Sequence, residues 1–369
     1  MNSQEWKILA RISDLNPGRH HRAQVYQLLA RNLDGNRLIN TAIKEGLAGL
    51  LYKYLLEADL LNTLNREQSQ KLAQIYYQLL YTNLNLTNAL KKVLHRLHEK
   101  DIQVVLLQGI DLIHRVYGDF GLRPLTDIDL WVLPKDFPGF IDIMIKKGFE
   151  RDRIYPNTFR KGATIFDVHT HILWADRIAA RKLILRNGET AVYKNTRFIR
   201  VDGQSARCLD PYDQVLYLSL HALKHYVNRL IWLVDIKCLV APWAQTDWAG
   251  FMNRARELGQ ERIVAYLLFL LAHLLDFHPP ESVIRLPGYH RLNVLEKKIL
   301  RRRIESSSLA LWAPVFLFSS GMNLRNRLQF MLESLFPDPD ILRQVFPATS
   351  DLKVRHLYLK RILQVFDRK

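Results

Sequence analysis

The sequence predicts an α+β protein in which a small mixed β-sheet forms the core and helical regions flank it on both sides. Two observations support this. Residues 1–100 and 206–369 repeat apolar side chains at spacings of three and four, the period of an amphipathic helix. Between them, compact apolar runs alternate with helical stretches and are closed by glycine or proline. We therefore expect a helical N-terminal region (1–100), a core (101–205) and a helical C-terminal region (206–369).

The expected helices lie mostly outside the core. In the N-terminal region, the apolar spacing covers QVYQLLARNLD, NTAIKEGLAGLLYKYLLEADLL and QSQKLAQIYYQLLYTNLNLTNALKKVLHRLHEK. In the C-terminal region, a helix is expected to begin at Pro211, because Asp210 is a favourable N-cap and Asp213 adds an acidic side chain to the first turn. Further helices are expected at about 229–241, 247–258, 260–276, 292–304, 323–335 and 351–366.

Three strands are expected in the core. DIQVVLLQG ends at Gly109 and is followed by a helical stretch. TDIDLWVLP is closed by Pro134, and the helix after it ends at Gly148. ATIFDVHTHIL, at 163–173, has the alternating character of a third strand.

The chain is strongly basic, with a formal net charge of +17. Such an excess favours polyanionic partners, which include nucleic acid, nucleotide phosphates and an anionic membrane surface. Cations cluster at 297–303 and 353–361, where they form either solvated helix faces or binding patches.

Targeting and membrane signals are weak. The two cysteines lack the spacing of a disulfide framework or zinc site, which fits a reducing cytoplasm. Charges interrupt the N-terminus where a signal peptide carries its apolar run. The apolar run at 264–275 is shorter than the roughly 20 residues that span a bilayer. The uncharged stretch 306–324 is expected to be buried or interfacial, so the protein is expected to be cytoplasmic, with peripheral membrane association as an option.

Asp127 and Asp129 lie two residues apart within the second expected strand. Side chains alternate between the faces of a strand, so the two carboxylates share one face while Ile128 and Leu130 occupy the other. Two carboxylates this close repel each other unless a cation or proton lies between them. A hard divalent ion such as Mg²⁺ is the simplest partner.

The third expected strand adds further polar groups. Asp167, His169 and His171 alternate in FDVHTH and so share one face. If this strand lies beside the second one, Asp167 completes a triad of carboxylates. Such a triad can hold two metal ions for an in-line phosphoryl or nucleotidyl transfer. Gly109, at a strand-to-helix junction, and Arg123, with its planar guanidinium, are candidate phosphate contacts.

Taken together, VVLLQGIDLIHRVYGDFGLRPLTDIDLWVLPKDF, FDVHTHIL and YLSLHALKHYVNRLIWLVDI resemble the uncharacterised nucleotidyltransferase family of the polymerase β-like superfamily. The resemblance covers roughly residues 101–240 and implies a polymerase β-like nucleotidyltransferase core. It implies an NTP as co-substrate and two Mg²⁺ ions, with Mn²⁺ as the alternative metal. The acceptor is left open among a sugar phosphate, a glycan, a peptide and RNA.

The resemblance also implies roles for individual residues. Asp127, Asp129 and Asp167 are the expected catalytic metal ligands, and Gly109 is expected at the nucleotide phosphates. Three departures from the usual pattern occur: Gln108 replaces a lysine, Thr126 replaces a glycine, and Ile110 stands where the wider superfamily has serine. The expected nucleotide-binding residues are Gly109, Gln108, Arg123 and His169.

Two alternatives remain open at this point. His221 and His225 have the spacing of half a zinc site but lack the glutamate of HExxH, so a buried hydrogen-bond network that includes Arg229 and Asp235 is favoured. The departure at Gln108 also allows a catalytically silent binding or scaffold protein instead of a nucleotidyltransferase.

Overall fold

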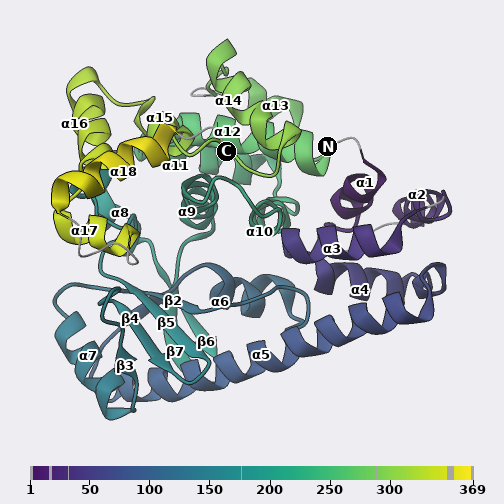
Figure 1. The fold of residues 1–369 in the computed structure, drawn as a ribbon, viewed down its shortest axis with the longest axis horizontal. Coiled ribbons are helices and arrows are strands. Elements are labelled where there is room, and N and C mark those ends of the chain that lie inside the picture. The colour runs from purple at the N-terminus through teal and green to yellow at the C-terminus, as the bar shows by residue number, and fades with distance from the viewer. Residues whose placement is uncertain are drawn as a thin grey trace.

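A computed structural model describes residues 3–15, 19–31, 33–175, 177–286, 289–346 and 353–366. Its centre is a seven-stranded mixed sheet in the order β3-β4-β5-β2-β1-β7-β6 (Figure 1). The strands are β1 (Val104–Leu106), β2 (Ile128–Val132), β3 (Glu150–Arg151), β4 (Thr158–Lys161), β5 (Thr164–His169), β6 (Arg197–Val201) and β7 (Gln204–Cys208). β2 pairs in antiparallel fashion with β1 and in parallel with β5. These pairings confirm the α+β class and the small mixed sheet.

The two faces of the sheet have different partners. Ile128 and Leu130 belong to a core formed with the long helix α5 (Arg66–His98) and with α7 (Phe137–Lys146). Trp131, one residue on, belongs to the other core, which is built largely from the N- and C-terminal helices. The alternation expected for β2 is therefore present. It directs Asp129 away from α5 and towards the C-terminal helices.

The N-terminal helices lead into the sheet. They are α1 (Gln4–Arg11), α2 (Arg19–Leu29), α3 (Gly35–Glu45), α4 (Ala48–Glu57) and α5. The helical stretch expected across Gly46 is two helices, because Gly46 adopts φ +78° and caps the end of α3. α5 begins with a capping box between Asn65 and Gln68 and runs from the N-terminal helices to beneath the sheet (Figure 1).

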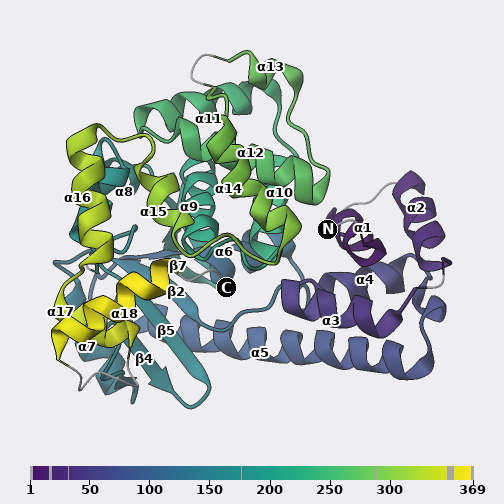
Figure 2. The same cartoon turned by 45° about the horizontal axis from the view of Figure 1, so that its top comes forward.

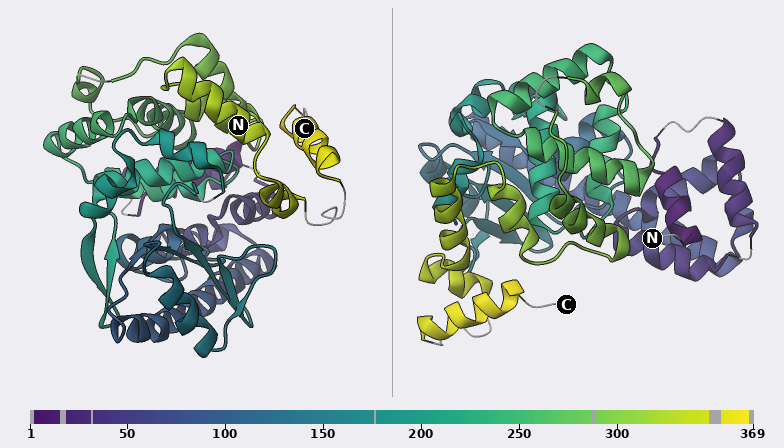
Figure 3. Two further views of the ribbon diagram at one scale, coloured as in Figure 1. Left: turned by 90° about the vertical axis from the view of Figure 1, so that its left-hand side faces the viewer. Right: turned by 90° about the horizontal axis from the view of Figure 1, so that it is seen from above.

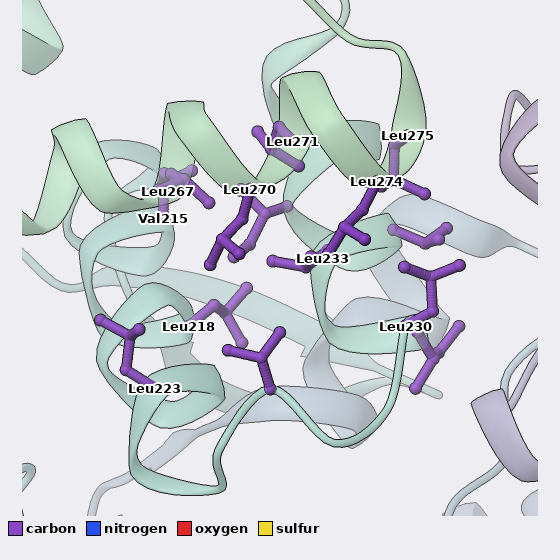
Figure 4. Close-up of a cluster of buried hydrophobic side chains, with 14 of the residues drawn as sticks. Val215, Leu218, Leu223, Leu230, Leu233, Leu267, Leu270, Leu271, Leu274 and Leu275 are labelled. Carbon is purple, nitrogen blue, oxygen red and sulfur yellow. The ribbon is translucent and has the colours of Figure 1, made fainter. Parts of the chain in front are cut away.

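The C-terminal helices form a second layer over the sheet. Those nearest to it are α9 (Pro211–Lys224), α10 (Ile231–Val240), α11 (Gln245–Glu257) and α12 (Glu261–Leu275). Leucines such as Leu218, Leu233 and Leu270 fill the space between α9, α10 and α12 (Figure 4). The Asp210 carboxylate accepts from the Tyr212 N–H at 3.0 Å, so the predicted start of α9 is confirmed.

The last helices extend along one side of the molecule. They are α13 (Glu281–Ile284), α14 (Val294–Glu305), α15 (Ala313–Ser319), α16 (Leu324–Leu335), α17 (Pro339–Val345) and α18 (Val354–Phe366). α17 and α18 lie near the β4 and β5 end of the sheet (Figure 2). In the described part of the chain, no helix is long and apolar enough to cross a membrane.

Four of the strands were not predicted from the sequence. β3, β4, β6 and β7 are short and rich in charged or polar residues, so they show no apolar run. One hairpin signal was nevertheless present: Asp202 and Gly203 both adopt positive φ between β6 and β7. Asp-Gly is the preferred pair for such a two-residue turn.

Candidate active site

The centre of the site is a pair of aspartates on neighbouring strands. Asp129 on β2 stands directly opposite Asp167 on β5, because the two strands are parallel and in this register. Asp129 is buried and Asp167 is partly exposed. The Thr158 hydroxyl, on the next strand β4, donates to Asp167 at 3.2 Å. The predicted adjacency of the second and third expected strands is therefore confirmed.

His169 joins these two carboxylates. Its Nε2 lies 3.1 Å from Asp129 Oδ1 and 3.8 Å from Asp167 Oδ2. Burial alone lowers the pKa of His169, but the hydrogen bond to Asp129 and the charges of both aspartates outweigh burial and raise it. The three residues offer ligand atoms within 4.8 Å of one another. Two carboxylates and one imidazole could hold a divalent cation.

Asp127 lies beside this group but outside it. It precedes the first residue of β2, and its carboxylate accepts from the Thr126 hydroxyl at 2.9 Å. Burial, together with the negative charge of Asp129, raises the pKa of Asp127 to about 7. The group of possible ligands therefore contains His169, with Asp129 and Asp167, where the expected triad contains Asp127. Ligation of a metal by Asp127 stays a prediction.

Gln108 and Gly109 form the junction between β1 and α6 (Gln108–Leu112), which a π-helical turn, η2 (Ile113–Tyr117), continues. The Gln108 side-chain amide donates to Asp129 at 2.9 Å and to the Tyr217 hydroxyl at 3.2 Å, so it orients a carboxylate. A Cβ at Gly109 would lie 2.0 Å from Arg123 Nη1. Glycine is therefore required here because the guanidinium approaches the backbone so closely.

Arg123 has a different partner from the one expected. Its guanidinium makes a buried bidentate ion pair with Asp235 on α10, with N to O distances of 2.8 to 3.1 Å. Nη1 donates to the Pro124 carbonyl at 3.2 Å, and the Tyr117 hydroxyl donates to Asp235 at 2.7 Å. Arg123 also lines the cavity beside Asp129 and Asp167, and its contact with a phosphate stays a prediction. Because the Arg123 guanidinium is held by Asp235 and lies against the backbone at Gly109, it helps to position the turn that contains Gly109.

Cations line the same cavity as the carboxylates. This cavity, of about 290 Å³, is lined by Asp129 and Asp167 on the sheet, by Lys224 on α9 and by Arg177 in the segment after β5. Lys224 Nζ lies 3.5 Å from the centre of the Trp174 ring. Burial, followed by the nearby positive charges of Arg181 and Arg177, holds the pKa of Lys224 well below its usual value. A polyanion in this cavity would relieve that repulsion.

His221 and His225 line the same cavity but do not join the expected network. Asp235 is engaged with Arg123 instead. The two imidazoles lie 4.6 Å apart between their ring centres and pack against Trp232. Burial lowers the pKa of His225 to about 3 and holds that of His221 far below its usual value, so both are neutral at pH 7. His221 Nδ1 is buried without a hydrogen-bond partner among the described residues.

A second cavity, of about 610 Å³, shares Asp127, Asp167 and His169 with the first and is also lined by the C-terminal helix α17. Tyr155 and Asn157 line it from the sheet side, and Ile341 and Gln344 on α17 line it from the other. The Tyr155 hydroxyl donates to the Gln344 carbonyl at 3.0 Å. Asp127 and Asp167 therefore line both cavities, whereas Asp129 lines the first.

His171 does not share the face of Asp167 and His169, because β5 ends at His169. Its Nδ1 lies 2.7 Å from Glu189, on α8 (Gly188–Lys194). Sequence reasoning also missed Lys224 as a site residue. A signal was available, since Tyr217, His221 and Lys224 recur at the spacing of one helix face.

The chain matches a known protein family over more than half of its length. The model of a family described as "Uncharacterised nucleotidyltransferase" matches residues 31–276. This range is wider than the 101–240 of the resemblance and takes in α4, α5 and α12 as well as both walls of the first cavity. No curated protein and no solved structure matches the chain. Because the family model covers well over half of the chain, the protein belongs to this nucleotidyltransferase family.

Proposed function

We propose that the protein transfers the nucleoside monophosphate group of an NTP to an acceptor and releases pyrophosphate. The observation that carries the proposal is the meeting of Asp129, Asp167 and His169 in the first cavity, with Asp167 and His169 also lining the second. In such a transfer the α-phosphorus forms a bond to an acceptor atom while its bond to the pyrophosphate oxygen breaks. The proton of the acceptor leaves to solvent or to a nearby base.

The chain's own residues supply binding and orientation. Asp129 and Asp167, with Asp127 beside them, would hold Mg²⁺ or Mn²⁺, which when bound stabilises charge on the phosphates and lowers the acceptor's pKa. Gln108 and His169 hold Asp129 in place through hydrogen bonds. Positioning of this kind is the main contribution that a protein makes to phosphoryl-type transfer.

We assign the triphosphate to the smaller cavity because its wall carries the cations. Lys224 and Arg177 line that cavity together with the carboxylates. Gln108 removes the positive charge that the family usually places before Gly109, and Lys224, protonated beside a bound triphosphate, would restore one. The larger cavity, lined by Tyr155, Asn157 and α17, is then left for the acceptor.

The test uses NTPs labelled at the α-phosphate, with Mg²⁺ or Mn²⁺ and a cell extract as the source of acceptors. Wild-type protein should transfer label to one class of molecule, and Asp129→Asn should reduce transfer by about a hundredfold or more. Asp142→Asn, an exposed change on α7, is the matched control and should retain activity. Full activity in Asp129→Asn would overturn the site. Nucleotide binding without transfer to any acceptor would favour the scaffold alternative.

A further inference from the structure

Helix α16 exposes an apolar stripe that the nucleotidyltransferase site does not use. Leu324, Leu328 and Leu332 are 74%, 53% and 58% exposed. They recur every four residues and therefore lie on one face of the helix. Phe336, 47% exposed, follows at the end of the helix in the same register.

Helix α18 lies against α16 and also exposes leucines. Leu359 and Leu363 are both more than half exposed and are also four residues apart. α18 contacts the end of α16 through Tyr358, whose ring centre lies 5.6 Å from that of Phe336 and whose hydroxyl donates to the Pro337 carbonyl at 2.9 Å. The two helices stand at one edge of the molecule, away from the N-terminal helices (Figure 3). We call the exposed apolar side chains of both helices the α16–α18 face: Leu324, Leu328, Leu332, Phe336, Leu359 and Leu363.

The charges around this face are mostly positive. Arg325 on α16 and Arg355 and Lys360 on α18 are exposed on the same helices. The two helices contain one carboxylate between them, Glu333, which accepts hydrogen bonds from the Ala180 N–H and the Gln329 amide. Exposed cations therefore outnumber carboxylates on these two helices.

We propose that the α16–α18 face docks on an anionic membrane surface. A helix that combines exposed leucines with Lys and Arg lies in the interface of a bilayer, where the leucines enter the acyl boundary and the cations meet anionic headgroups. The long cationic side chains can reach the headgroups while their stems lie along apolar surface. Like charges would instead face each other if a second copy of the chain covered this face.

A second exposed apolar stripe, on α5, lacks the nearby cations of the α16–α18 face. α5 exposes Tyr77, Tyr81 and Leu84, but residues 72–90 carry no charged side chain. That stripe has apolar area without attraction for an anionic surface. It therefore provides an internal comparison for the α16–α18 face.

The location of the face gives docking a consequence for the site. α17, which lies between α16 and α18 in the chain, contributes Ile341 and Gln344 to the larger cavity beside the carboxylates. Docking would place that cavity close to the lipid surface. The docking itself requires no catalytic chemistry, so Asp129→Asn should bind vesicles as the wild type does.

Sedimentation with vesicles tests the proposal on the full chain. Wild-type protein should pellet with vesicles of phosphatidylcholine and phosphatidylglycerol but not with phosphatidylcholine alone. Leu328→Glu with Leu332→Glu should lower the partition coefficient by roughly tenfold or more, while the matched pair Tyr81→Glu with Leu84→Glu should leave it unchanged. Arg355→Gln with Lys360→Gln should weaken binding, whereas Lys297→Gln with Lys298→Gln on α14 should not.

Three results would overturn docking at this face. One is the absence of pelleting with anionic vesicles at low salt. Another is an equal loss in the α5 and α16 pairs. The third is a concentration-dependent dimer, seen by sedimentation velocity, that Leu328→Glu with Leu332→Glu abolishes while vesicles bind neither protein; this result would assign the face to a second copy of the chain.

Discussion

Replacing Asp235 with alanine should destabilise the protein strongly, although Asp235 is remote from the carboxylate pair in sequence. Asp235 is 0% exposed and accepts three contacts from Arg123 at 2.8 to 3.1 Å, in addition to the Tyr117 hydroxyl. Removing one partner leaves a buried guanidinium without its counter-charge, which costs about 3–5 kcal/mol. A native state is typically stable by roughly 5–15 kcal/mol, so the change is a large fraction of the total.

Urea unfolding of Asp235→Ala measures this loss. We expect the midpoint to fall with little change in the slope of the free energy against urea. Glu281→Ala is the control, because its ion pair with Arg285 is exposed and long, at 3.8 Å, and should give no measurable change. The double variant Arg123→Met with Asp235→Leu should recover much of the loss, since it removes both buried charges. A loss below about 1 kcal/mol in Asp235→Ala would refute the assignment of Arg123 as a structural partner of Asp235.

Three further predictions concern the site. Because the pKa of Asp127 is raised to about 7 and a metal needs the ionised carboxylate, Mg²⁺ affinity measured by calorimetry should rise between pH 6 and pH 8, with proton release, and Asp127→Asn should flatten this rise. In the metal-free protein, the same raised pKa means that the contribution of Asp127 to stability is present below about pH 4 and is lost as the pH rises through 7; Asp127→Asn should remove this loss in thermal melts. Lys224→Met should raise the KM for the NTP by about tenfold or more while Lys182→Met, on the neighbouring 3-10 segment η3 (Ala179–Ile184), leaves it unchanged; an unaltered KM in Lys224→Met would remove Lys224 from the triphosphate site.

Features that depend on neighbours along the chain were predicted well. The N-cap at Asp210, the long helix α5 and the alternation of β2 all follow from side chains within a few residues of one another. The short strands β6 and β7 were missed because their sequences are polar. Their Asp-Gly turn was the only local signal for them.

Site residues divide in the same way. Strand alternation placed Asp129 and Asp167 on usable faces, but the group that forms includes His169, whose ring turns towards Asp129 from the parallel neighbour strand. The ion pair of Arg123 with Asp235 was not predicted, because Asp235 lies 112 residues further along the chain. A guanidinium chooses its carboxylate by proximity in the fold, which no spacing in the sequence reports.

The sequence by itself therefore determined the strand that carries Asp129, the helices around it and the nucleotidyltransferase family, although Asp127 lies just before that strand and not within it. The tertiary structure decided which polar groups meet: His169 with the aspartates, Arg123 with Asp235, and Lys224 in the same cavity as the aspartates. The physical reason is that periodicity is set by local backbone geometry, whereas ion pairs and cavity walls arise only when distant elements bury their apolar faces against one another.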